Sequence, residues 1–513
     1  MDKLTASIVL ASVLALGLPG SEVAAQGQPD GQLTIAFDAS IAPTFLDPAE
    51  TPGIGTPFVF LYALHDALIK PLPGNDMAPC VAESWKESPD GLVYEFKLRE
   101  GLRFHNGDPV TAEDVKFSFQ RYRGASAKLL HDRVKAVEIP DLYRVRFVLH
   151  TPWPDFLVFY ATPATGAAWI VPKKYIEKVG EDGFKRQPVG LGPYRFVRMN
   201  PGIELVLEAN EQYWRKKPTI KRVVIKGIPD RTTRLAMLKT GEADIGYLMV
   251  GLEAATIKAD PKLRLAKVIP PAAWWMEFPE QWNPKSPWND RRVRLAANLA
   301  VDKQGLNEAE RLGFSRLTGS IIPSGMDFAL RIDPYPYDPT HAKRLLADAG
   351  YPNGFDAGDL TPLPPFTTMG EAVANYLATV GIRTRLRSME RATYMEAWRA
   401  KRLGGVIVTV SAAPGSTAVR LESFVISTAP YASGGYPDID ELFRQQAQER
   451  DRKKRETLLH QIQRLMHERI MFGPIFEPST LHGVGPRVEE PAIGLTTQLY
   501  FAAPYEDIRL KKP

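Results

Sequence analysis

Cysteine is nearly absent from this 513-residue sequence, and histidine is scarce. The single cysteine, Cys80, cannot form an intramolecular disulfide, so a hydrophobic core must stabilise the fold. Eight scattered histidines with one cysteine argue against a metal centre. His460 and His467 lie seven residues apart on a predicted helix, where surface histidines are the simpler interpretation. We therefore expect no bound metal and no cofactor.

Catalytic motifs and a strong charge of one sign are missing as well. There is no Gly-x-Ser-x-Gly elbow and no phosphate-binding glycine-rich loop. The 64 lysines and arginines nearly balance 59 acidic residues, which gives a formal net charge of +5. Basic residues are dispersed, and the run from Arg452 to Arg455 is expected to be a solvated helix face, so nucleic-acid binding is not expected. These absences favour a binding protein over an enzyme.

Long apolar runs are absent apart from one at the beginning of the sequence. Residues 4–18 are mostly apolar and follow Lys3, and the small residues 23–25 come shortly after them. The run is too short to span a membrane and has the flanks of a secretory signal peptide. We expect residues 1–25 to be a signal peptide cleaved after Ala25, which predicts release into the periplasm.

The composition that is present is that of a globular protein, with 44% hydrophobic and 24% charged residues. Residues 94–99 alternate apolar and charged side chains, which predicts a half-buried strand. Thr111, followed three residues later by Asp114, is a near variant of a capping box and predicts a helix start. Asp230 and Gly241 similarly bound another predicted helix. Helix and strand signals that alternate in this way are typical of an α/β fold.

The stretch over residues 77–123 carries more than secondary structure. Its sequence, MAPCVAESWKESPDGLVYEFKLREGLRFHNGDPVTAEDVKFSFQRYR, closely resembles a segment shared by the bacterial extracellular solute-binding proteins of family 5. Those proteins are the peptide- and nickel-binding subunits of ABC importers. Later segments are similar to family motifs too, including GLGPYRF at 190–196, GEADI at 241–245 and YDPTHAKRLLADAGYPNG at 337–354. The resemblance runs from about residue 33 to 509.

The resemblance implies a periplasmic-binding-protein type II architecture, an α/β fold with two lobes joined by a hinge. The family inserts an extra small α+β domain into lobe one. Projected onto this sequence, lobe one comprises residues 26–71, 186–270 and 472–513, the extra domain residues 72–185, and lobe two residues 271–471. A lobe built from separated segments requires the chain to cross between lobes, and such crossings serve as hinges.

The function that the resemblance implies is that of a periplasmic substrate-binding protein of an ABC importer. It would be a monomer that captures a peptide or peptide-like small solute by lobe closure and delivers it to the membrane permease. A receptor for a non-peptide solute, such as an opine or a sugar-like compound, remains the alternative. An exported enzyme and a chaperone-like binder of unfolded chains are weaker alternatives.

Aromatic residues concentrate in the segment 272–288, which contains four tryptophans. Such density at a lobe junction suits an apolar pocket with stacking surfaces. We expect Trp274 or Trp275 to contact the ligand and Glu277 to meet a cationic group. Ordinary core packing is the competing interpretation for the tryptophans, and a solvated or paired carboxylate is that for Glu277.

The second candidate region is the segment 404–420. Peptide-binding relatives resemble "W..D..DP" here, and their acid holds the α-amino group of the ligand. This chain has no acid in that loop, and a buried ammonium without a counter-charge costs several kcal/mol. Either another acid serves or the ligand is not a typical peptide. We expect Arg420 to be a carboxylate partner. The other expected contacts are Ser411, Ala412, Ala413 and Ser416.

Overall fold

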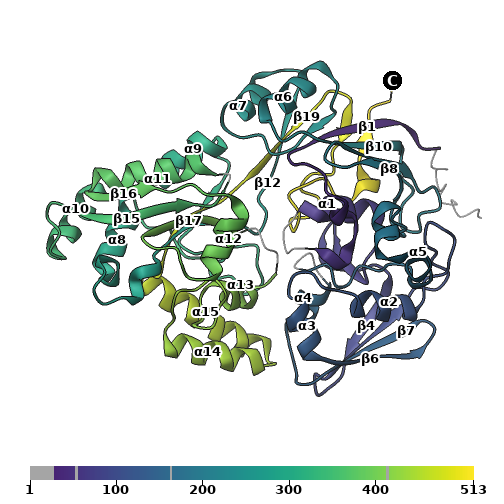
Figure 1. Ribbon diagram of the computed structural model, residues 1–513, viewed down its shortest axis with the longest axis horizontal. Coiled ribbons are helices and arrows are strands. Elements are labelled where there is room, and N and C mark those ends of the chain that lie inside the picture. The colour runs from purple at the N-terminus through teal and green to yellow at the C-terminus, as the bar shows by residue number, and fades with distance from the viewer. Residues whose placement is uncertain (1–27, 52–55, 162–164, 365, 412–414, 513) are drawn as a thin grey trace, which may run out of the picture.

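The computed structural model describes residues 28–51, 56–161, 165–364, 366–411 and 415–512, so the predicted signal peptide lies outside the described residues. Figure 1 shows two bodies, one around a seven-stranded sheet and one around a six-stranded sheet. Among the described residues, no helix has the length and apolar character that crossing a membrane requires. The expected α/β architecture with two lobes is confirmed.

The sheet of lobe one has the strand order β12-β19-β11-β1-β10-β9-β8. Strand β1 is parallel to both of its neighbours, with Ile35 opposite Ile225 on one side and Ile245 on the other. The carboxyl ends of these three strands therefore meet at one edge of the sheet. The strands are β1 (Asp30–Phe37), β8 (Tyr194–Asn200), β9 (Glu204–Ala209), β10 (Ile220–Gly227), β11 (Ile245–Gly246), β12 (Arg264–Val268) and β19 (Thr480–Val484).

The helices of lobe one are α1 (Thr56–Leu64), α6 (Arg231–Thr240) and α7 (Gly251–Ala259). Helix α6 begins and ends as predicted, because the side chain of Asp230 accepts a hydrogen bond from the Thr233 N–H and Gly241 adopts the left-handed conformation. Helix α1 is buried along almost its whole length. It therefore lies inside the lobe and does not form part of the surface.

The extra domain is built on a four-stranded antiparallel sheet in the order β4-β5-β7-β6. The predicted strand is β5, and the predicted helix start at Thr111 carries both hydrogen bonds of a capping box with Asp114. One apolar cluster contains both Ile35 of lobe one and Phe147 of the extra domain, so the two parts share a core. The elements are β4 (Ala82–Glu87), β5 (Val93–Leu98), β6 (Val134–Asp141), β7 (Arg144–Leu149), α2 (Ala112–Gln120), α3 (Ala127–Arg133), α4 (Phe156–Ala161) and α5 (Lys173–Arg186).

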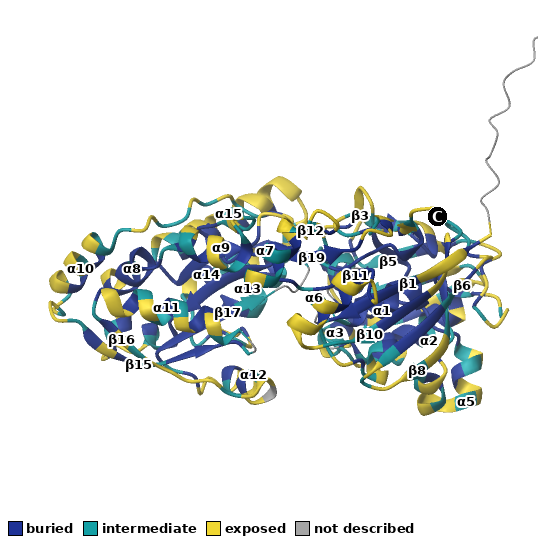
Figure 2. Cartoon of the chain, turned by 90° about the horizontal axis from the view of Figure 1, so that it is seen from above, coloured by how far each residue is buried: buried dark blue, intermediate teal, exposed yellow. Residues whose placement is uncertain are grey.

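The sheet of lobe two has the order β14-β18-β13-β17-β15-β16. Figure 2 shows its strands dark blue beneath helices with yellow outer faces, as expected of a sheet covered on its faces. The strands are β13 (Ala273–Glu277), β14 (Arg316–Leu317), β15 (Phe355–Pro362), β16 (Ile382–Leu386), β17 (Val406–Ser411) and β18 (Phe472–Glu477). The helices are α8 (Arg291–Ala300), α9 (Lys303–Arg311), α10 (Pro339–Asp348), α11 (Thr367–Thr379), α12 (Arg391–Arg399), α13 (Thr417–Phe424), α14 (Pro437–Gln448) and α15 (Arg452–Glu468).

The chain crosses between the two large sheets at two neighbouring places. It leaves lobe one after β12 and enters lobe two at β13, and it returns between β18 and β19. Val268 lies opposite Thr480 in the sheet of lobe one, so the two crossing segments run side by side. Strand β18 pairs with β13, so residues 472–477, which were expected in lobe one, lie in the sheet of lobe two. With this change, the division into three parts remains our proposal.

Candidate functional site

The N-terminal end of α13, which follows β17 in the chain, lies where lobe two contacts the other body. Ser416 is the N-cap residue of α13, and its Oγ lies 3.3 Å from Oδ1 of Asp155 in the extra domain. Val419, one turn further on, packs against the apolar cluster of lobe one. Ser411, at the other end of the loop between β17 and α13, is half-buried and lies opposite Ala273. Ala412 and Ala413, two expected ligand contacts, lie outside the described residues.

Arg420 is buried near Ser411 and forms no ion pair with any described acidic residue. Its side chain is 2% exposed, and Nη2 donates a hydrogen bond to the Ser411 carbonyl oxygen at 3.2 Å. Nη1 has no hydrogen-bond partner in the part of the chain that the structure describes. The guanidinium lies over the rings of Trp275 and Phe424, at 5.9 and 5.5 Å from their centroids. Burial lowers the pKa of Arg420 to about 9, so this cation is strongly desolvated.

The predicted aromatic contacts lie in the core of lobe two. Trp274 and Trp275 occupy opposite faces of β13, which lies between two strands of the sheet. Trp274 packs edge-to-face on Phe366 with the ring centroids 5.2 Å apart, whereas Trp275 lies under Arg420. Both are at most 1% exposed. The structure thus places only Trp275 beside another predicted site residue, and a ligand contact for either tryptophan stays a prediction.

Glu277 lies at the opposite end of β13 from the loop. It is paired with Ile407, whereas Ala273 at the near end of the strand is paired with Ser411. The carboxyl is 5% exposed, and burial raises the pKa of Glu277 to about 8. The structure therefore does not bring Glu277 together with Arg420, and we leave it out of the site that we propose.

A buried ion pair joins the two bodies next to the loop. Nη2 of Arg455 on α15 pairs with Oδ2 of Asp155, and Nε of the same arginine donates to Oε1 of Gln446 at 3.0 Å. Arg455 and Asp155 are each 6% exposed. The expectation of a solvated face at residues 452–455 is therefore wrong for Arg455. No local sequence signal identifies this pair, because its partners are 300 residues apart.

A second contact between the bodies is exposed. Nη2 of Arg450 lies 3.1 Å from Oε1 of Glu87, and Nη1 donates to the carbonyl oxygen of Pro89. The side chains of Arg450 and Glu87 are 42% and 40% exposed, so water competes for both of them. The two ion pairs therefore place α15 and the segment before it against the extra domain, and Figure 1 shows α15 and α14 at the side of lobe two next to α3 and α4.

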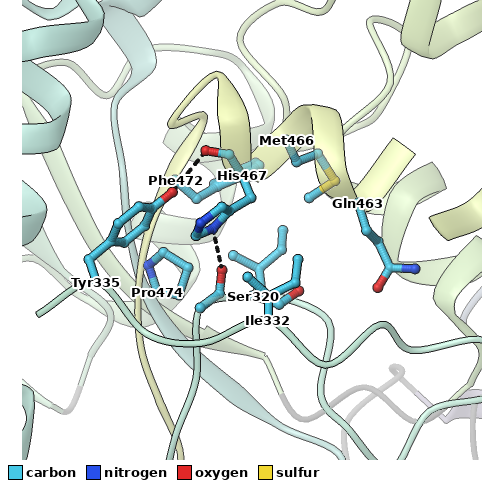
Figure 3. A pocket seen from close by; sticks show the side chains of 10 residues that line it. Ser320, Ile332, Tyr335, Gln463, Met466, His467, Phe472 and Pro474 are labelled. Carbon is cyan, nitrogen blue, oxygen red and sulfur yellow. Dashed lines mark hydrogen bonds between the residues drawn. The ribbon is translucent and has the colours of Figure 1, made fainter. Parts of the chain in front are cut away.

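The predicted helix with two histidines contains no metal site among the described residues. Figure 3 shows His467 stacked on Tyr335, with ring centroids 4.5 Å apart, and its Nδ1 lies 3.3 Å from the Gly319 carbonyl oxygen. His460 instead lies beside Glu456. The cavity next to His467 has a volume of about 10 Å³, which is room for one water molecule and not for a solute.

Three similarities to known proteins cover most of the chain. Residues 76–431 match the family described as bacterial extracellular solute-binding proteins, family 5 Middle. Heme-binding protein A of Haemophilus influenzae is 29% identical and the alignment covers 81% of each chain. Di/tripeptide-binding protein 2 of Pseudomonas aeruginosa is 28% identical, covering 91% of this chain and 93% of the relative.

The fold is similar to that of a solved transport protein. The periplasmic binding protein DppA of Helicobacter pylori, solved in complex with the peptide STSA, superposes with a TM-score of 0.77 at 25% identity. That alignment covers 94% of this chain and 98% of DppA. With the family match spanning more than half of the sequence, the chain belongs to the bacterial extracellular solute-binding proteins of family 5.

Proposed function

We propose that this protein is the periplasmic receptor of an ABC importer and that it captures a peptide or peptide-like small solute. Family membership and the similarity to a di/tripeptide-binding protein and to peptide-bound DppA support this proposal. The receptor acts as a monomer, closes its two lobes around the solute and presents the closed form to the permease. It binds and releases the solute without changing it chemically, and it needs no cofactor.

The observation that carries the proposal furthest is the buried guanidinium of Arg420, which has one unpaired nitrogen among the described residues. A buried arginine whose Nη1 has no partner among the described residues is costly, because its charge has lost water without gaining a counter-ion. A carboxylate is the group that best fits the forked donors of an arginine. The carboxylate of a peptide or of a related acid, bound from the side of Ser411 and Ser416, would supply the missing partner.

Lobe closure supplies the mechanism of capture. The two crossing segments beside Val268 and Thr480 are the only described backbone connections between the two large sheets. Small changes in the backbone dihedral angles of these segments therefore reorient one lobe against the other. Lobe one and the extra domain share a core and would move together. In the closed form, Ser416 and Arg455 of lobe two contact Asp155 of the extra domain.

A non-peptide solute is the second candidate. The loop at residues 411–416 has no acid, unlike the loop expected in peptide receptors, and one relative is named a heme-binding protein. A neutral or anionic organic solute could use Arg420, Ser416 and backbone groups without an acid. In that case specificity would come from the loop and not from an amino-group site.

Mass spectrometry of small molecules released by denaturing the purified protein tests the proposal. Released compounds are then added back to ligand-free protein, and the melting temperature is measured for wild type, Arg420→Gln and the exposed control Arg344→Gln. A released carboxylate-bearing peptide or peptide-like acid that stabilises wild type and the control, but not Arg420→Gln, is the expected result. A stabilising solute without an acidic group, or equal stabilisation of all three proteins, would contradict the proposed role of Arg420.

A further inference from the structure

Asp38 occupies the place where parallel sheets most often bind ligands. It directly follows β1, at the edge where the carboxyl ends of β1, β10 and β11 meet. The chain segments after the neighbouring strands flank it, because Ile228 N donates to Phe37 O at 2.7 Å and Tyr247 N donates to Ala36 O at 3.0 Å. Ligands of open α/β sheets bind in the crevice outside the carboxyl ends of the strands.

The carboxylate of Asp38 lacks the partner that such a shielded acid needs. Its Oδ1 is shielded from solvent and accepts no hydrogen bond from any described residue. Arg234 is the cation that acts on it, but that guanidinium is committed to backbone carbonyls. Its donors go to Ile228 O at 2.6 Å, Tyr247 O at 2.9 Å, Pro229 O at 2.9 Å and Leu248 O at 3.1 Å. Burial, only partly opposed by Arg234, raises the pKa of Asp38 to about 6.

Asp38 also lies at the edge of the sheet where the chain crosses to lobe two, because β11 is parallel to β1 and antiparallel to β19, whose first residue Thr480 lies opposite Val268. The phenol of Tyr500 is within electrostatic reach of both Asp38 and Arg391, since burial and Asp38 raise the pKa of Tyr500 while Arg391 lowers it. Arg391 is the first residue of α12, which Figures 1 and 2 both place at the end of lobe two nearest lobe one. A solute held between the lobes would therefore meet Asp38 from one side.

We propose that Asp38 binds a cationic, hydrogen-bond-donating group of the solute, such as a primary ammonium. This inference rests on the proposed function and narrows its substrate class to zwitterions: the acid absent from the loop at 411–416 is supplied by the opposite lobe. Asp38 and Arg420 then form two charged sites of opposite sign, one on each lobe, and among the described residues neither side chain forms an ion pair. A solute with both charges satisfies the two sites only when the lobes close, which couples recognition to closure.

The test compares a mixed di- and tripeptide pool with the same pool after complete N-acetylation. Acetylation removes the ammonium charge and keeps the carboxylates. Melting-temperature shifts and titration calorimetry are measured on wild type, Asp38→Asn and Asp182→Asn, which changes an exposed aspartate of the extra domain. Wild type and Asp182→Asn should bind the free-amine pool at least about tenfold more tightly than the acetylated pool, as expected for a charged hydrogen bond. Asp38→Asn should bind the two pools equally.

The other outcomes each overturn part of the argument. If Asp38→Asn still prefers free amines, or if wild type binds both pools equally, the role of Asp38 is refuted while the receptor function stands. If wild type binds neither pool but is stabilised by released solutes without a cationic group, Asp38 is refuted and the non-peptide alternative holds. If neither the pools nor any released compound shifts the melting temperature, the receptor proposal fails, and the role of Asp38 fails with it.

Discussion

The ion pair between Asp155 and Arg455 allows a quantitative prediction about lobe closure. The pair joins the extra domain to α15, and the side chains of Arg455 and Asp155 are 7% and 9% exposed. Opening the lobes returns both charges to water, so the pair influences the balance between open and closed states and not the fold of either lobe. Asp155→Asn keeps the size of the side chain and removes its charge.

The magnitude follows from what Arg455 retains in the variant. Removing one member of a buried ion pair costs about 3–5 kcal/mol because the other charge is left uncompensated. Arg455 keeps its hydrogen bond to Gln446 and its position 5.4 Å from the centre of the Phe328 ring, and the new amide oxygen still accepts a hydrogen bond. We therefore expect a loss of about 1.5–3 kcal/mol in the closed state, which raises the Kd for solute about 10- to 150-fold.

Calorimetry with the solute released from the purified protein measures the Kd, and small-angle X-ray scattering measures the radius of gyration without solute. Arg455→Gln should weaken binding similarly, and the double variant should lose less than the sum of the two single losses. Arg450→Ala is the matched control, because its pair with Glu87 also joins the bodies but is exposed, so it should change the Kd by about twofold or less. A Kd for Asp155→Asn within twofold of wild type, with unchanged scattering, would refute the reasoning.

Three further predictions concern protonation and helix capping. The pKa of Asp38, raised to about 6, predicts that a cationic solute binds more tightly as pH rises from about 5 to 7, and calorimetry on Asp38→Asn should show no such rise. The pKa of Glu277 rises from 4.5 to about 8 on folding, so the folded state favours the protonated form and this stabilisation is lost as pH rises through 8. Glu277→Gln should therefore raise stability by roughly 2 kcal/mol or more at about pH 9 and little at about pH 4, measured by chemical denaturation. Thr111→Ala removes half of a capping box and should cost about 1 kcal/mol in the same measurement.

Local signals in the sequence predict several elements of the fold. The capping box at Thr111, the left-handed Gly241 and the alternation along residues 94–99 are each decided by neighbours within a few residues. Hydrogen-bond geometry at a helix end or a strand repeat is set by such neighbours, so these predictions needed no tertiary information. The two-lobed architecture came instead from the resemblance to a family, since no local pattern encodes it.

Residues whose role depends on distant partners could not be predicted in this way. Arg455 stands in a basic run that is typical of a solvated helix face, and only its contact with Asp155, 300 residues away, buries it. The sequence of β18 does not show which sheet this strand joins, because its pairing with β13 depends on residues that are far away in the sequence. The density of aromatic residues predicts a ligand contact for Trp274 or Trp275, but the sequence does not show that β13 has a strand on each side and is buried on both faces.

The charges at the lobe junction explain why closure would depend on the solute. Among the described residues, Nη1 of Arg420 and Oδ1 of Asp38 have no hydrogen-bond partner without solute, and each unmade interaction costs free energy. The Asp155–Arg455 pair acts in the opposite direction, because it is satisfied in the closed form whether or not solute is present. A receptor must release its cargo, so this pair can only partly offset the cost of the two unpaired charges. Pairing both charges with a zwitterionic solute then shifts the balance to the closed form. A permease must distinguish this closed, solute-bound receptor from the receptor without solute.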